Sequence, residues 1–175
     1  MNDSYMKFSF VAISRLIFIV IILIGPSHPI YSQSCYHPFV ETVIANVNPG
    51  NLALYTRVLS GDTTSIIDGQ IYRILTRYHS STGNEKASHY IYERFQEFGL
   101  NARYQVYSST GTNVIGIKPG AKYPNRQLII CGHYDAITFA SQDTVPGADD
   151  NASGVSGVIE AARVLSQYDL DYTVV

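Results

Sequence analysis

Two short motifs in the second half of the chain carry the residues best suited to bind a metal. The first, G-H-Y-D, occupies positions 132–135 and contains His133. The second, P-G-A-D-D-N-A-S-G, occupies positions 146–154 and returns two acids, Asp149 and Asp150, to the same part of the chain. A neutral imidazole and an ionised carboxylate are both good zinc ligands. The two motifs therefore predict a metal site in which His133 and Asp149 are ligands.

The other acids of these motifs have supporting parts in this prediction. A metal-binding histidine usually gives its second ring N–H to an acceptor, and Asp135 lies on the same side of an extended chain as His133. Asp149 has two carboxylate oxygens, so it can bridge two ions, and Asp150 is expected to support the site. A purely structural alternative remains, because acids before a helix also favour its positive N-terminal end.

Together the motifs resemble the signature of the M28 family of zinc metallopeptidases, the di-zinc aminopeptidases and their relatives. The resemblance implies a zinc-dependent exopeptidase that hydrolyses N-terminal residues of peptides with metal-activated water, using two zinc ions. It makes His133 a zinc ligand, Asp149 the bridging ligand and Asp135 the residue that orients the histidine. It also implies a cis peptide bond between Asp149 and Asp150.

The sequence departs from the family pattern after the second motif. M28 peptidases have a Glu-Glu pair after the next strand, which supplies the general base and a ligand, and then a further acid and a distal histidine. This chain ends at Val175, inside the segment 172–175 that resembles this next strand. We therefore expect the 175 residues to be the N-terminal part of such an enzyme and to be inactive alone.

Three other interpretations stay open at this point. The first is a glutaminyl-cyclase-like acyltransferase with a single zinc. The second is a non-catalytic homologue that acts as a binding module. The third is an unrelated α/β domain whose acids only cap a helix.

Helices and strands alternate in the sequence, which predicts an α/β fold with a central, mostly parallel sheet and helices on both faces. The continuous apolar run 128–131 predicts a buried central strand. Thr82-Gly83-Asn84-Glu85 has the pattern of a capping box and predicts a helix to Phe98 that ends at Gly99. The remaining expected elements are helices over 51–59 and 153–167, a hairpin of strands over 101–108 and 112–117, and a last strand over 172–175.

The segments between these elements are assigned less fully. Residues 35–50 are expected to be an irregular lead-in, residues 61–69 a polar loop and residues 122–126 a polar connection. The segment 71–78 fits either a helix or a strand. With these limits, the peptidase-like domain covers residues 51–175.

The N-terminus has the features of an export signal. Lys7 and Arg15 precede ten apolar residues over 16–25, too few to span a bilayer, and small residues follow at 32 and 34. We expect residues 1–34 to be a cleaved signal peptide and the protein to be secreted or periplasmic, without stable membrane association afterwards. An uncleaved membrane anchor is the alternative.

Charge and cysteine content add two expectations. The formal net charge of −2 gives no electrostatic case for binding nucleic acid. Export would permit a disulfide between Cys35 and Cys131, but Cys131 falls in the expected buried strand. We therefore expect two unpaired thiols, with Cys131 packed in the core.

Overall fold

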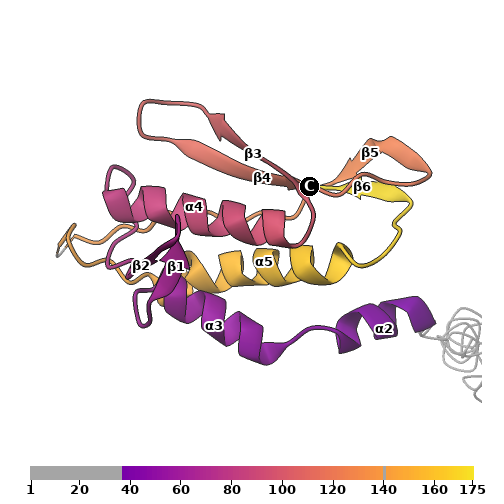
Figure 1. Ribbon diagram of the computed structural model, residues 1–175, viewed down its shortest axis with the longest axis horizontal. Helices are drawn as coiled ribbons and strands as arrows, with labels where there is room; N and C mark the ends of the chain where they lie inside the picture. The colour runs from indigo at the N-terminus through magenta and orange to yellow at the C-terminus, as the bar shows by residue number, and fades with distance from the viewer. Residues whose placement is uncertain (1–36, 140) are drawn as a thin grey trace, which may run out of the picture. The chain divides into compact units, whose positions relative to one another are not determined.

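The computed structural model describes residues 37–139 and 141–175, so the expected signal peptide lies outside the described residues. It contains mixed helices and strands (Figure 1), as the sequence predicts. In chain order the elements are α2 (Pro38–Ala45), α3 (Pro49–Leu59), β1 (Ser65–Ile67), β2 (Gln70–Tyr72), α4 (Thr82–Glu97), β3 (Asn101–Val106), β4 (Thr112–Ile117), β5 (Tyr123–Leu128), the short helical turn η1 (Ala148–Ala152), α5 (Ser153–Leu165) and β6 (Tyr172–Val174).

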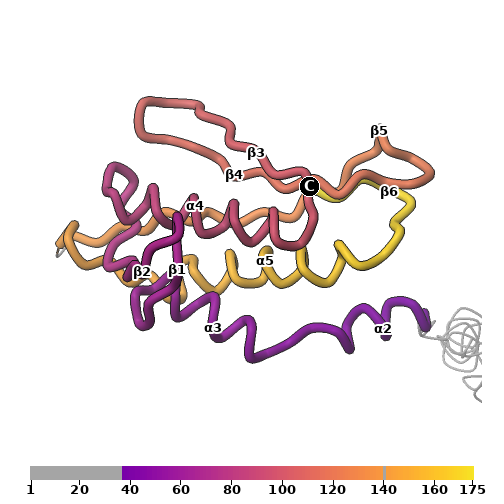
Figure 2. The backbone as a smooth tube through the Cα atoms, viewed as in Figure 1, coloured from indigo at the N-terminus to yellow at the C-terminus, as the bar shows by residue number. Residues whose placement is uncertain are grey.

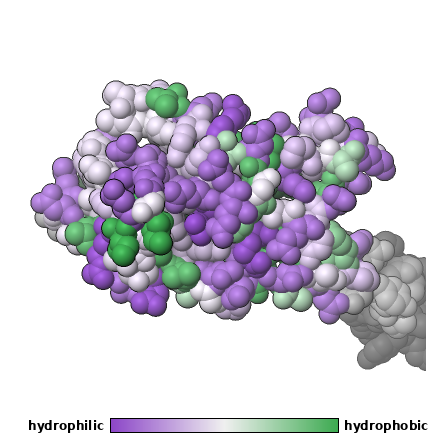
Figure 3. All heavy atoms as spheres, viewed as in Figure 1, coloured by the Kyte–Doolittle hydropathy of each residue, from purple (hydrophilic) through white to green (hydrophobic). Residues whose placement is uncertain are grey.

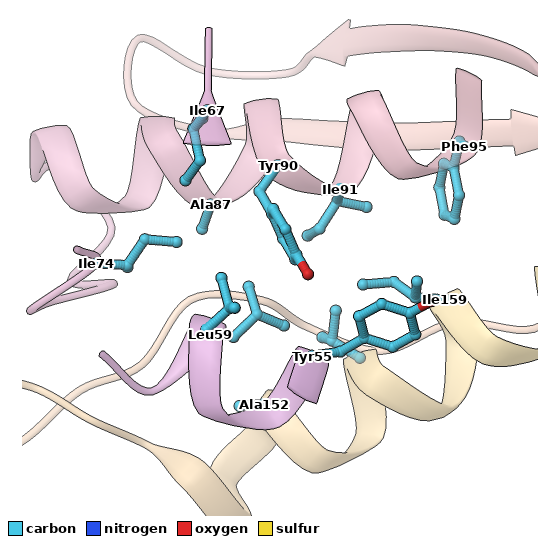
Figure 4. Packing of buried hydrophobic residues seen from close by; sticks show 12 residues of the cluster. Tyr55, Leu59, Ile67, Ile74, Ala87, Tyr90, Ile91, Phe95, Ala152 and Ile159 are labelled. Carbon is cyan, nitrogen blue, oxygen red and sulfur yellow. The ribbon is translucent and has the colours of Figure 1, made fainter. Parts of the chain in front are cut away.

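The core forms where α4 packs over α3 and α5. Apolar side chains from all three helices and from β1 point into this layer (Figure 4). The most central of them are Leu59, Ile67, Ala87 and Ile159, none of which has more than 1% of its surface exposed. Burial of such side chains is the main term that stabilises the arrangement of the helices.

The start of α4 differs by one residue from the prediction, whereas its end is as predicted. Ser81, not Thr82, caps the helix, because its Oγ accepts a hydrogen bond from the Asn84 amide at 3.1 Å. At the other end Gly99 has a φ of 75°. The amide of Leu100 donates to the carbonyl of Phe95, which closes the C-terminal turn.

The strands pair as three two-stranded sheets in the part of the chain that the structure describes. β1–β2 and β3–β4 are antiparallel hairpins, and β5–β6 is a parallel pair. The predicted hairpin over 101–117 is confirmed. A single, mostly parallel sheet with helices on both faces is not confirmed.

The strand expected at 128–131 is wrong in its position and burial. β5 covers Tyr123–Leu128, so it includes the expected polar connection and ends where the apolar run begins. Backbone pairing continues beyond it, because the Ile130 amide donates to the Val175 carbonyl at 2.9 Å. However, Leu128, Ile129 and Ile130 are 57%, 69% and 41% exposed, and Cys131 is also exposed. One neighbouring strand pairs with this segment, and a buried strand needs covering layers on both faces as well.

Two segments expected to be irregular contain regular structure. The lead-in 35–50 contains α2 and the start of α3, where the Asn48 side chain accepts a hydrogen bond from the Gly50 amide at 2.8 Å. The loop 61–69 contains β1 and the turn of the β1–β2 hairpin, in which Asp68 and Gly69 have φ of 53° and 73°. Positive φ at two central residues is typical of a tight hairpin turn.

The β1–β2 hairpin presents one face to the core and one to solvent. Ile67 is buried, whereas its neighbour Ile66 pairs across the hairpin with Ile71 and both are exposed. Figure 3 shows a hydrophobic patch in the region of this hairpin. The alternation of inward and outward side chains fixes the register of the pair.

The backbone between β5 and α5 makes a long excursion. Figure 2 shows it passing along α4 toward the β1–β2 end and returning to the start of α5. Both sequence motifs, at 132–135 and 146–154, begin in this connection between β5 and α5. Over 37–139 and 141–175, no helix is long and apolar enough to cross a membrane.

Candidate metal centre

The imidazole of His133 lies between two carboxylates. Its Nδ1 is 3.3 Å from Oδ1 of Asp135 and 3.2 Å from the Asp135 carbonyl oxygen. Its Nε2 is 3.1 Å from Oδ1 of Asp150. The three residues are therefore brought together as one cluster, with a different ring nitrogen facing each acid.

Asp149 contacts the start of α5 through its backbone. Its backbone carbonyl accepts a hydrogen bond from Ser153 Oγ at 3.1 Å. The carboxylate that faces His133 belongs to Asp150, whose side chain is 84% exposed. Of the two acids, Asp150 is thus the one with a carboxylate contact to His133.

Neither acid caps α5 through a side-chain hydrogen bond. The side chain that accepts from the first turn is that of Asn151, whose Oδ1 receives the Gly154 amide at 3.1 Å. The residues directly before η1 and α5, Gly147 and Ala152, make no side-chain capping hydrogen bond. The Asp150 carboxylate is thus left for the cluster with His133.

The backbone around Asp150 departs from helical geometry. Asp150 has φ −115° and ψ 90°, and the cis peptide bond lies between Asp150 and Asn151. The cis bond expected between Asp149 and Asp150 is therefore found one residue later. Gly147 begins this turn with a φ of 48°, and a Cβ there would lie 2.7 Å from Ala136 Cβ. Glycine allows the two motif loops to approach this closely.

Arg77 lies behind the cluster and was not identified from the sequence. Its side chain is fully buried and donates hydrogen bonds to backbone carbonyls of both motif loops, Tyr134 at 2.7 Å and Gly147 at 2.9 Å. Burial lowers the pKa of Arg77 to about 10, and the nearby charges of Asp135 and Asp150 oppose that shift. At neutral pH the guanidinium is therefore a buried cation beside two acids of the site.

The chemistry of these donors fits zinc, although their number falls short of a complete site. An imidazole nitrogen and a carboxylate oxygen, both open to solvent, are typical zinc ligands. Catalytic zinc has three protein ligands and an open position. Among the residues that the structure describes, no group of three or more His, Cys, Asp or Glu is placed to hold a metal ion. The described part of the chain thus supplies His133 and Asp150 as two candidate ligands.

A cavity of about 540 Å³ adjoins the cluster. His133 and Asp135 line one side of it, and apolar residues of α4 and α5, such as Ile91 and Val155, line another. A concave, mostly apolar space beside a few polar groups is the usual form of a small-molecule site.

Two further histidines, His79 and His89, lie outside the two motifs. The structure pairs His89 with Asp68, with Nδ1 2.8 Å from Oδ2, on the surface of α4. The carbonyl of His79 accepts a hydrogen bond from the Asn84 side chain at 3.4 Å. These contacts are structural.

Comparison with known proteins supports the resemblance carried by the two motifs. Residues 113–175, which include both, match the model of Peptidase family M28. The chain is 33% identical over 101 residues to leucine aminopeptidase 1 of Sclerotinia sclerotiorum, which covers 51% of this chain and 26% of that protein. It is 37% identical over 65 residues to aminopeptidase YwaD of Bacillus subtilis, which covers 37% of this chain and 13% of that protein.

Solved structures share the fold at low sequence identity. LapB from Legionella pneumophila has a TM-score of 0.61 and 19% identity, over 79% of this chain and 36% of that chain. A Zn-dependent exopeptidase from Parabacteroides distasonis has a TM-score of 0.55 and 17% identity, over 74% and 46%. The glutaminyl cyclase of Tannerella forsythia has a TM-score of 0.56 and 16% identity over the same shares.

The matches cover a minor part of each relative. This chain spans about a quarter of leucine aminopeptidase 1 and less than half of each of the three structures. The predicted resemblance to the M28 zinc metallopeptidases is confirmed.

Proposed function

We propose that this chain is the N-terminal part of a zinc-dependent aminopeptidase, which hydrolyses N-terminal residues of peptides with metal-activated water. The observation that carries the proposal is the cluster in which His133 Nε2 faces Asp150 Oδ1 at 3.1 Å. The match of residues 113–175 to Peptidase family M28 supports the same reaction class.

In this proposal His133 and Asp150 are the zinc ligands that the chain contributes. Asp150 takes the bridging place that the sequence assigned to Asp149, because its carboxylate faces the histidine. Its two oxygens allow it to bind two zinc ions, the number that we propose for the whole protein. The remaining ligands and the general base belong to the rest of the protein.

Each residue of the cluster has a distinct part in the chemistry. When bound, zinc acts as a Lewis acid that activates water and polarises the scissile carbonyl. Asp135 accepts the Nδ1 proton of His133 and so keeps Nε2 unprotonated for metal binding. Asp150 supplies negative charge on the opposite side of the ring. The cavity beside the cluster offers space for the apolar part of a substrate.

We also propose the finer architecture that the three small sheets leave open. In the whole domain, the parallel β5–β6 pair would form part of a central, mostly parallel sheet with helices on both faces. The fold similarity to the Legionella and Parabacteroides structures supports this proposal, and the matched part is 36% and 46% of those two chains.

Export to the periplasm or the cell exterior is a separate proposal, based on the N-terminal sequence. N-terminal sequencing of the mature protein tests it: a first residue near 35 supports signal cleavage. An intact N-terminus in the membrane fraction would favour the uncleaved anchor instead.

Hydrolysis of an amino-acid anilide by the natural gene product tests the proposed function. We expect activity that a chelator abolishes and zinc restores, and no activity in the His133→Ala variant. Release of ammonia from a peptide with N-terminal glutamine, without anilide hydrolysis, would favour the glutaminyl-cyclase alternative. The fold similarity to the Tannerella glutaminyl cyclase is the reason to include this assay. Zinc binding without either reaction would favour a non-catalytic binding module.

A further inference from the structure

The backbone of residues 75–77 lies between the two motif loops and bonds to both. The amide of Ala136, in the first loop, donates to the carbonyl of Arg77 at 2.9 Å. The amide of Val145, before the second motif, donates to the carbonyl of Leu75 at 3.0 Å. Thr76 forms a parallel bridge with Val145. This segment is therefore the element against which both loops are placed.

The side chain of Arg77 also bonds to both loops, through its guanidinium group. Nε donates to the carbonyl of Tyr134, the residue between His133 and Asp135, at 2.7 Å. Nη1 donates to the carbonyl of Pro146 at 2.8 Å, and Nη2 donates to that of Gly147 at 2.9 Å. Nη1 also donates to the carbonyl of Leu59 at the end of α3. One side chain thus fixes the first loop, the second loop and a core helix at a common point.

Packing alone does not require a buried cation at this point. Removing a charge from water is costly unless hydrogen bonds satisfy it, and apolar side chains of similar volume often replace buried charges without loss. Arg77 has no exposed surface, and each of its donor nitrogens reaches a carbonyl oxygen. The planar guanidinium, here called the fork, points its N–H donors at several acceptors in fixed directions, which an apolar side chain or a lysine cannot do.

The second loop is shaped to receive this fork. The carbonyl of Gly147 accepts from Arg77 and also from the Ala152 amide at 3.0 Å, so it connects the guanidinium to the last residue of η1, directly before α5. A Cβ at position 147 would lie 2.9 Å from Nη2 of Arg77. In the chain, Asp150 lies between Gly147 and Ala152, which this hydrogen bond joins, so the position of its carboxylate depends on them.

We propose that Arg77 is a positioning residue, which holds the His133 loop and the Asp150 loop at one spacing so that the two ligands are pre-organised for zinc. The inference rests on the proposed metal site and extends it to a residue that touches no metal. It requires the zinc affinity of the chain to depend on the guanidinium fork more than on the general stability of the fold.

The test compares Arg77→Met, Arg77→Lys and a control, Ile67→Ala, in the natural gene product, which also supplies the remaining ligands. Ile67 is buried on β1 and lies outside both loops, so its truncation lowers stability without touching the cluster. The zinc dissociation constant is measured by competition with a chromophoric chelator, and the melting temperature is recorded for each variant. We expect Arg77→Met to weaken zinc binding about tenfold or more, comparable with the loss of other outer-shell partners.

The other two variants separate positioning from stability. Arg77→Lys keeps the charge but loses the fork, so its affinity should fall between those of Arg77→Met and the parent chain. Ile67→Ala should lower the melting temperature but keep zinc affinity within about twofold, because distant sites act independently. Equal zinc affinity in the parent chain and both Arg77 variants would overturn the inference. If Arg77→Met does not fold, Arg77→Lys carries the comparison.

Hydrogen exchange gives a second readout that needs no metal. In the Arg77 variants the amides of Ala136 and Ala152 should lose protection by about tenfold or more relative to Ile67→Ala. If the parent natural gene product binds no zinc, the proposed metal site fails, and the exchange result still decides whether Arg77 positions the loops. Unchanged protection at both amides would refute the positioning role whatever the zinc result.

Discussion

Nε2 of His133 lies 3.1 Å from Oδ1 of Asp150, whereas Asp149, one residue earlier, directs its carbonyl to the Ser153 hydroxyl. Two adjacent aspartates thus have different surroundings within one turn of chain. One faces the only histidine of the two motifs, and the other belongs to the start of α5. The difference makes the assignment of the metal ligand testable by paired substitutions.

Replacing Asp150 by Asn should remove most zinc binding, because the amide keeps the shape of the side chain but lacks the charge of the ligand. The loss should exceed the roughly tenfold to hundredfold that loss of an outer-shell partner costs. The measurement is the zinc dissociation constant, obtained by competition with a chromophoric chelator.

Asp149→Asn is the matched control for this substitution. It changes the same functional group one residue away, and we expect zinc affinity to stay within about threefold because Asp149 contacts the helix start through its backbone. The reverse result, with zinc lost in Asp149→Asn and kept in Asp150→Asn, would restore the assignment made from the sequence.

The sequence identified the cluster but not its internal geometry. Histidine and acid motifs are visible because each ligand is a particular side chain at a particular spacing, and His133, Asp135 and Asp150 come together as that pattern indicates. Which of two neighbouring acids faces the histidine depends on backbone rotation at Asp150 and Asn151, which are both non-helical. That rotation leaves no signature in the residue types.

Arg77 could not be predicted for a different reason. Its partners are backbone carbonyls 18, 57, 69 and 70 residues away in the sequence. Every residue has a carbonyl, so the partners carry no identity that a motif could record. By contrast, α4, α5 and the β3–β4 hairpin depend on local periodicity and turn residues, and they lie close to their predicted ranges.

Cys131 should react with a thiol reagent in the native chain. It was expected in a buried strand, but the structure leaves it exposed beyond the end of β5. In a Cys35→Ser background, we expect one thiol to be labelled by Ellman's reagent at a rate similar to that in denaturant. Labelling that occurs only after unfolding would show that another layer covers the segment 128–131, as the sequence first indicated.

Glu160 should make stability depend on pH in the acidic range. Glu160 is 1% exposed, and its side chain accepts hydrogen bonds from the Asn48 amide at 2.7 Å and from Arg163 Nη2 at 2.6 Å. Burial raises the pKa of Glu160, but hydrogen bonds from Arg163, Asn48 and Asn51 outweigh it, and the net pKa lies below the ordinary value of 4.5. A lowered pKa in the folded state means that the charge stabilises the fold above 4.5 and that this contribution disappears as pH falls through the lowered pKa.

Urea unfolding of Glu160→Gln measures this contribution. At about pH 7 the variant should be less stable by about 1–3 kcal/mol, because a buried hydrogen-bonded charge is lost, and the difference should shrink as pH falls below about 4. Asp62→Asn, which removes an exposed partner of Arg57, should change stability by no more than about 0.5 kcal/mol. A difference for Glu160→Gln that stays constant with pH would contradict the role of the charge.

Two glycine substitutions should change stability in opposite directions. Neither Gly69 nor Gly157 has an atom within 4 Å of the position that a Cβ would occupy, so steric contact is equal in the two cases. Gly69 has a φ of 73° in the β1–β2 turn, and Gly69→Ala should cost roughly 1–2 kcal/mol because L residues are strained there. Gly157 lies inside α5, and Gly157→Ala should stabilise the chain by about 0.5–1 kcal/mol because alanine loses less backbone freedom in a helix.

Thermal unfolding of the two variants beside the parent chain gives both signs at once. A gain in stability for Gly69→Ala would show that residues 68–69 do not form the left-handed turn, and with it the register that buries Ile67 would have to be reassigned.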